Sequence, residues 1–220
     1  QQRVFLQACW HAIEDAGLAA RNLAGSNCGV FVGCVPSDYD QRLQDNYLNA
    51  QRLMGGASSI LAARISYLLD LQGPCMAVDT ACSSSLVAIA EACNSLALGN
   101  TDLALAGGVC VIIGPQLYVM GTKSGVFSPE GRCFTFSQRA NGFVPGECVG
   151  VLALKRLDDA LRDRDPIHGV LRGWGINQDG RTNGISAPNG RAQTRLQTDV
   201  YQRFGIDPAN IQLVEAHGTG

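Results

Sequence analysis

Short apolar runs that alternate with helix-like segments constrain the fold of this chain more than any other feature. The runs that predict buried strands span residues 29–35, 75–78, 103–113, 149–154, 170–176 and 211–215. The segments with helical apolar spacing or high alanine content span residues 4–16, 60–71, 87–98 and 191–204. This alternation predicts one α/β domain with a mostly parallel sheet covered on both faces, and residues 114–146 form a long, loop-rich insertion in it.

The composition supports a globular protein and excludes two classes of partner. Of 220 residues, 46% are hydrophobic and 16% are charged, which is enough apolar surface to argue against intrinsic disorder. The 17 basic and 19 acidic residues leave a formal net charge of −2, and neither sign forms a long run. Nucleic acid and anionic membranes are therefore not expected as partners, and no apolar run is long enough to predict a transmembrane helix.

Nine cysteines would suit a disulfide-rich secreted protein, but their pattern favours free thiols. The number is odd, and no two cysteines have the two-residue spacing of a zinc or redox site, so no metal is expected. The six that we expect to be small, buried side chains are Cys9, Cys28, Cys34, Cys75, Cys93 and Cys110. Since so many thiols would be oxidised in a secretory compartment, we expect a cytoplasmic location.

Cys82 is the first candidate for a catalytic residue. It lies directly between an apolar strand, residues 75–78, and the start of a helix. The positive end of a helix dipole and its unpaired N–H groups stabilise a thiolate, and the same N–H groups suit an oxyanion hole. A buried cysteine that packs like alanine is the alternative, and position alone leaves both interpretations open.

His217 is the second candidate. It follows the last predicted strand in a glycine-flanked loop, and parallel sheets place functional residues at the carboxyl ends of strands. A lone histidine is more often structural than catalytic. Cys82 and His217 could nevertheless meet at the same edge of the sheet. The neighbouring serines, residues 83–85, do not predict a serine hydrolase because the chain has no Gly-x-Ser-x-Gly elbow. We expect them instead to bind the first amides of the helix.

Several motifs together resemble one family along essentially the whole chain. They are QQR at 1–3, DTACSSSL at 79–86, GVFSPEGRC at 125–133, GE at 146–147, NQDG at 177–180, NGISAPNG at 183–190 and EAHGTG at 215–220. This set resembles the β-ketoacyl synthase domain of modular type I polyketide synthases, in the elongating branch. One departure is Cys148, which stands where glycine commonly follows Glu147, a residue that helps to order the site in relatives.

The resemblance implies a thiolase-like fold with layers in the order α-β-α-β-α, usually in a homodimer. Here the fold is expected to be incomplete, with the N-terminal half and the start of the C-terminal half. Residues 1–220 would form a partial ketosynthase domain, an internal piece truncated at both ends. The family's second catalytic histidine and its lysine would lie beyond Gly220, so we expect this piece alone to be inactive.

The resemblance also implies the reaction and its partners. Cys82 would accept the acyl chain from the phosphopantetheine arm of an acyl carrier protein, and an acyltransferase domain would act with it in cis or in trans. His217 would be the first catalytic histidine, assisting decarboxylation of a malonyl-type extender before Claisen condensation. No cofactor would be bound directly, and the substrate-binding residues are not predicted. The alternative is a non-elongating ketosynthase that relays acyl chains without condensation.

Overall fold

The computed structural model describes residues 1–42 and 49–220. Two compact units divide the chain. The first contains Gln1–Arg156 together with Glu215–Gly220, and the second contains Leu157–Val214. Each unit is described by itself.

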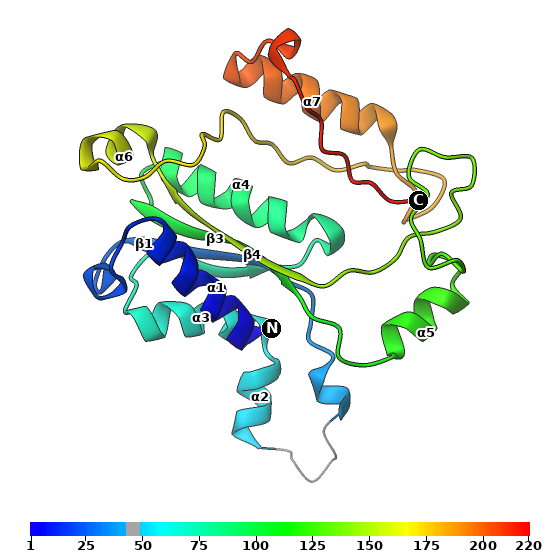
Figure 1. Ribbon diagram of the computed structural model, residues 1–220, viewed down its shortest axis with the longest axis horizontal. Helices are drawn as coiled ribbons and strands as arrows, with labels where there is room; N and C mark the ends of the chain where they lie inside the picture. The colour runs from blue at the N-terminus through cyan, green and yellow to red at the C-terminus, as the bar shows by residue number, and fades with distance from the viewer. Residues whose placement is uncertain (43–48) are drawn as a thin grey trace. The chain divides into compact units, whose positions relative to one another are not determined.

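A four-stranded sheet forms the centre of the first unit (Figure 1). Its strands are β1 (Cys28–Gly33), β2 (Cys75–Val78), β3 (Leu103–Cys110) and β4 (Cys148–Lys155), in the spatial order β2-β1-β3-β4. β1 pairs in parallel with both β2 and β3, which confirms the predicted parallel pairing. β4 pairs antiparallel with β3.

Helices cover both faces of this sheet (Figure 1). α1 (Gln2–Asp15) and α3 (Ser58–Leu69) lie on one face, and α4 (Ser84–Ala97) lies on the other. The strand residues alternate accordingly, because successive side chains point to opposite faces. In β1, for example, Val30 and Val32 pack with α1 and α3, whereas Phe31 packs with α4.

The region between β3 and β4 is less irregular than its composition predicts. It contains α5 (Gln116–Lys123) and a small aromatic cluster. The rings of Phe127 and Phe143 meet edge to face with their centroids 5.0 Å apart, and Tyr118 lies against Phe127 at 6.3 Å. This region therefore has local packing of its own. The first unit also contains α2 (Ala50–Gly56).

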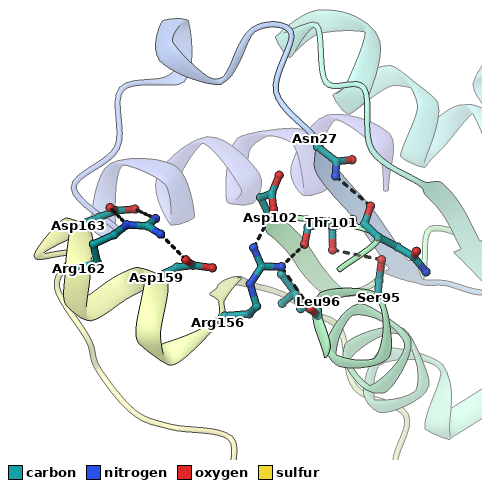
Figure 2. Close-up of polar contacts among 10 residues, drawn as sticks. Asn27, Ser95, Leu96, Thr101, Asp102, Arg156, Asp159, Arg162 and Asp163 are labelled. Carbon is teal, nitrogen blue, oxygen red and sulfur yellow. Dashed lines mark hydrogen bonds and ion pairs between the residues drawn. The ribbon is translucent and has the colours of Figure 1, made fainter. Parts of the chain in front are cut away.

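Arg156 joins the end of α4 to the start of β3 within the first unit (Figure 2). Its Nη1 donates to the carbonyl oxygens of Leu96 at 3.2 Å and Thr101 at 2.7 Å. Its Nη2 lies 2.7 Å from Asp102 Oδ1. A cation favours the carbonyl end of a helix, so this contact stabilises the C-terminus of α4.

The second unit contains α6 (Leu157–Asp163) and α7 (Gly190–Phe204). The side chain of Asn189 accepts hydrogen bonds from the first amides of α7, and Gly205 ends the helix with a left-handed φ of 61°. In α6, Arg162 forms ion pairs with Asp159 and Asp163 on its own helix (Figure 2). α7 confirms the predicted helix over residues 191–204.

The predicted strand over residues 170–176 is wrong. This segment has no regular secondary structure, and it packs along α7. The rings of Trp174 and Phe204 lie 4.7 Å apart, and Arg203 donates to the Trp174 carbonyl. Gly173 and Gly175 bring the backbone close to Val200. An apolar run can be buried by a helix as well as by a sheet, and here the helix supplies the contacts.

The predicted strand over residues 211–215 is also wrong. These residues are exposed and carry no regular secondary structure. A strand needs a neighbour for its N–H and C=O groups, and none of the strand pairings in the described residues includes this segment. A short apolar run therefore does not by itself make a strand.

Burial of the cysteines follows the prediction for four of the six. Cys9, Cys28, Cys34 and Cys93 are buried. Cys75 is exposed because it begins β2, one of the two edge strands of the sheet, and Cys110 is half-buried at the end of β3. The prediction that these last two are fully buried is therefore wrong.

Candidate active site

The turn that carries Cys82 joins β2 to α4. It is a short 3-10 helix, Ala81–Ser83, that leads directly into α4 at Ser84. Ala81 has a left-handed φ of 55°, a conformation that costs a residue with a Cβ about 1–2 kcal/mol. Cys82 follows this strained residue and is exposed. The predicted strand, turn, thiol and helix start are thus contiguous in the structure.

Three side chains hold the turn in place. Asp79 Oδ1 accepts a hydrogen bond from the Ala81 N–H at 3.0 Å. Ser84 Oγ accepts from the Thr80 N–H at 2.9 Å and donates to the Ala81 carbonyl at 2.6 Å. Ser83 Oγ donates to the Thr80 carbonyl at 2.9 Å.

The serines therefore have a different role from the one the sequence suggests. Polar residues at a helix start usually bind the first amides of that helix, and we expected the same here. Ser83 occupies the N-cap position of α4, but its side chain makes no such bond. The side chains of Ser83 and Ser84 bind into the turn and so hold the backbone on either side of Cys82. The Ser83 side chain therefore leaves the first amides of α4 uncapped.

Two glycines allow the start of α4 to lie against the sheet. A Cβ on Gly33, the last residue of β1, would lie 2.3 Å from the backbone of Ser84. A Cβ on Gly108 in β3 would lie 2.6 Å from the Cβ of Ser85. Side chains at these positions would push the helix start away. Glycine is thus required by the close approach of the turn to two strands.

Two carboxylates hold the loop that follows β3. Asp38 Oδ2 accepts from the N–H groups of Ile113 at 2.9 Å and Gly114 at 2.8 Å. Glu147 Oε1 accepts from the Ile112 N–H at 2.7 Å. The resemblance implies that Glu147 helps to order the site, and this hydrogen bond ties Glu147 to the loop after β3. Sequence reasoning missed Asp38, because no local motif announces a carboxylate that binds 75 positions away.

His217 lies on a short segment, Glu215–Gly220, that belongs to the first unit. Thr135 Oγ1 donates to the Gly218 carbonyl at 2.6 Å. At Gly220, a Cβ would lie 2.6 Å from the Phe134 amide nitrogen and 3.1 Å from the Gly142 carbonyl oxygen. The end of the chain therefore lies on the loop-rich region (Figure 1). His217 itself is exposed.

Cys82 and His217 are therefore both exposed residues of the same compact unit. Among the residues that the structure describes, no hydrogen bond joins them. Their pairing in catalysis stays a prediction. The structure places Cys82 on the turn before α4 and His217 on the segment Glu215–Gly220.

The described residues hold neither a metal-binding cluster nor a membrane-spanning helix. Within residues 1–42 and 49–220, no three His, Cys, Asp or Glu side chains gather in a way that could hold a metal ion. In that same part of the chain, none of the helices has the length and apolar character to cross a bilayer.

Comparison with protein families gives two matches that divide the chain. The N-terminal domain of β-ketoacyl synthases matches residues 1–160, and the C-terminal domain of β-ketoacyl synthases matches residues 168–220. The chain belongs to the β-ketoacyl synthase family. The junction of the two matches lies close to the boundary between the two compact units of this ketosynthase.

Relatives of the chain include polyketide synthases. The chain is 47% identical over 220 residues to polyketide synthase PksL of Bacillus subtilis, covering 100% of this chain and 5% of that protein. It is also 47% identical over 222 residues to a phenolphthiocerol/phthiocerol polyketide synthase subunit of Mycobacterium tuberculosis, covering 100% of this chain and 14% of that subunit. The chain thus spans a small part of these curated relatives.

Solved structures show the same relationship. The ketosynthase from module 6 of the bacillaene synthase of Bacillus subtilis matches with a TM-score of 0.92 and 47% identity, covering 100% of this chain and 37% of that one. An oxazolomycin ketosynthase domain from Streptomyces albus matches with a TM-score of 0.91 and 39% identity, covering 38% of its chain. The predicted thiolase-like α/β fold, present in part, is confirmed.

Proposed function

We propose that the protein carrying this chain is an acyltransferase that forms carbon–carbon bonds by decarboxylative Claisen condensation in polyketide biosynthesis. The observation that carries the proposal is the exposed Cys82 thiol, held on a strained and hydrogen-bonded turn at the start of α4. In this proposal, residues 1–220 are part of one ketosynthase domain that bridges both compact units.

The first half-reaction is transfer of an acyl chain to Cys82. The thiolate attacks the carbonyl carbon of an acyl thioester on the phosphopantetheine arm of an acyl carrier protein. A new thioester forms on Cys82, and the carrier's thiol leaves. The negative charge on the attacked oxygen is stabilised where backbone N–H groups point toward it, and the N-terminus of α4 supplies such groups.

The second half-reaction uses His217. A malonyl-type extender on the carrier loses carbon dioxide and becomes an enolate, which attacks the carbonyl carbon of the Cys82 thioester. The new carbon–carbon bond forms, the C–S bond to Cys82 breaks, and the Cys82 thiolate leaves while the β-keto chain stays on the carrier. A ring N–H of His217 would donate to the enolate oxygen, where charge develops. The resemblance assigns the second histidine and the lysine of the reaction to positions beyond Gly220. No cofactor is bound directly, because the phosphopantetheine arrives on the carrier protein.

The partners follow from this chemistry and from the sheet. An acyl carrier protein must deliver both substrates, and an acyltransferase domain, in cis or in trans, must load the extender. A second copy of the chain is the proposed partner of β2, one of the two edge strands. Three exposed apolar side chains lie on β2 and the helices beside it: Met76 at 39% exposure, Tyr67 at 85% and Leu86 at 70%.

A cytoplasmic location is proposed from the thiols. All nine cysteines are free, and Cys82 must stay reduced to accept an acyl chain. Reducing compartments keep thiols in that state.

The experiment is loading of a radiolabelled acyl group from an acyl carrier protein onto the intact protein. Wild type is expected to become labelled, and Cys82→Ser is expected to remain folded, as judged by circular dichroism, without label. Cys133→Ser removes another exposed thiol and is the matched control, with loading as in wild type. Equal loading of Cys82→Ser and wild type would disprove the role of Cys82.

A second measurement separates condensation from relay. When malonyl carrier is added to the loaded protein, condensation releases carbon dioxide and gives a β-keto product. Loading without either product would contradict the proposed condensation and support a non-elongating ketosynthase.

A further inference from the structure

Two cysteines lie directly opposite each other at one end of the sheet. Cys110 ends β3 and Cys148 begins β4, and the antiparallel register pairs them. Opposite residues of an antiparallel pair have Cα atoms about 4.5–5.5 Å apart and point to the same face. Disulfides span Cα separations of about 4.4–6.8 Å. The backbone thus places the two thiols at a distance that a disulfide can bridge.

The pair lies beside the Cys82 turn, on the α4 side of the sheet. Gly108, two residues before Cys110, is the residue that abuts Ser85. Burial raises the pKa of Cys110, and the charges of Glu147, Asp38 and Cys82 raise it further. Cys110 therefore shares its surroundings with the proposed nucleophile and with both carboxylates that hold the loop after β3.

The two thiols differ in their access to solvent. Cys148 is exposed, whereas Cys110 is half-buried. An oxidant from solution therefore reaches Cys148 first. Cys110 lies opposite and can attack the oxidised sulfur, which is the arrangement of a reactive cysteine with a resolving partner.

We propose that Cys110 and Cys148 form a reversible disulfide when a hydroperoxide oxidises the protein. The Cys148 thiolate attacks one peroxide oxygen, the O–O bond breaks, and a sulfenic acid forms with release of hydroxide. The Cys110 sulfur then attacks the sulfenic sulfur, the S–S bond forms, and the oxygen leaves as water. Two thiols and one hydrogen peroxide give one disulfide and two waters.

The bond would join the two strand ends beside an existing contact. Glu147 precedes Cys148, and its carboxylate binds the N–H of Ile112, two residues after Cys110. The disulfide would therefore fix the start of the loop that Glu147 and Asp38 hold. Its formation does not depend on the proposed acyl transfer, so the two proposals can fail separately.

The experiment treats the intact protein with hydrogen peroxide, blocks the remaining thiols with iodoacetamide, and maps linked peptides by mass spectrometry without reduction. Trypsin is unsuitable because residues 65–122 contain no Lys or Arg and hold four cysteines on one peptide. A protease that cuts after Asp and Glu separates them. It is expected to give peptide 103–130 linked to peptide 148–158, and two fewer free thiols per chain.

Single variants provide the controls. Cys110→Ser and Cys148→Ser are each expected to abolish the link, and dithiothreitol is expected to reverse it in wild type. Cys133→Ser removes an exposed thiol outside the pair and should leave the link intact. Linkage of Cys148 to another cysteine would overturn the proposal. So would a wild-type protein that loses thiols to peroxide without any linked 103–130 and 148–158 peptides.

Discussion

The two faces of the sheet are packed in opposite ways. The face under α1 and α3 is filled by large side chains such as Phe5, Ile13 and Ile65, all at 1% exposure or less. On the face under α4, four of the six buried cluster residues are alanines, and Phe31 and Leu96 are the two large ones. The face under α1 and α3, here the first face, therefore buries much apolar surface. The face under α4, here the second face, allows the helix to approach the sheet closely.

This difference separates stability from positioning. Burial of large side chains supplies most of the hydrophobic free energy of a core. Small residues bring a helix and a sheet together, and here they bring the N-terminus of α4 against Gly33 and Gly108. The turn with Cys82 lies on this tightly packed side. The two faces should therefore respond to mutation in opposite senses.

The largest expected effect is the loss of a large side chain from the first face. Phe5→Ala leaves a cavity where a fully buried ring packed between α1 and the sheet, and it should lower the free energy of unfolding by about 3–5 kcal/mol. Denaturant unfolding of the intact protein measures this. Val4→Ala, on the same helix at 40% exposure, is the control and should cost far less. Equal losses would contradict the assignment of this face as the stabilising one.

On the second face, the addition of a single methyl group should be enough to lower the free energy of unfolding. Gly33→Ala places a Cβ against the Ser84 backbone, which cannot move like a flexible side chain, and overpacking of this kind costs about 1–3 kcal/mol. Because α4 must shift, acyl loading of Cys82 should also fall in protein that remains folded. Gly55→Ala, in α2, has open space around its Cβ and should raise the free energy of unfolding by about 0.4–1 kcal/mol while leaving acyl loading unchanged. Normal loading by Gly33→Ala would show that the close approach does not position Cys82.

The sequence could predict the elements that have a local signal, but not those that depend on a distant partner. Strands β1 to β4 could be predicted because each is a short apolar run, and α1, α3, α4 and α7 because their apolar spacing or composition is helical. The runs at 170–176 and 211–215 are similarly apolar but pair with none of the strands in the described residues. A local sequence pattern does not reveal whether a segment will find a neighbouring strand for its hydrogen bonds.

The candidate site divides in the same manner. Cys82 could be predicted because strand, turn and helix start are adjacent in the sequence. The bonds of Ser84 into the turn could not, because they depend on the left-handed backbone at Ala81. The contact of Asp38 with the loop after β3 joins residues far apart in the chain, and only the folded structure brings them together.

Alkaline pH should weaken the first face through two buried thiols. Burial raises the pKa of Cys9 to about 12, from 9.0, and that of Cys28 to about 12. Between these values the unfolded chain releases protons that the folded chain keeps. Stability is therefore fully present below about pH 9 and falls as the pH rises toward about 12, by at most about 1.4 kcal/mol per pH unit for each thiol.

The measurement is the free energy of unfolding of wild type and Cys9→Ala at about pH 8 and about pH 10.5. Cys9→Ala should be less stable at the lower pH but should lose less stability on going to the higher one. Other groups that titrate in this range contribute equally to both proteins. Identical slopes would show that the Cys9 thiol does not carry the pH dependence.

The smallest expected effect tests the strain on the second face. Ala81→Gly relieves about 1–2 kcal/mol of left-handed strain, but it gives the unfolded chain more freedom, which costs about 0.4–1 kcal/mol. The free energy of unfolding should therefore rise by at most about 1.6 kcal/mol. The bonds of Asp79 and Ser84 to the turn remain available, so acyl loading should stay near the wild-type rate. A stable Ala81→Gly protein with much slower loading would instead show that the Cβ of Ala81 itself holds Cys82 in position.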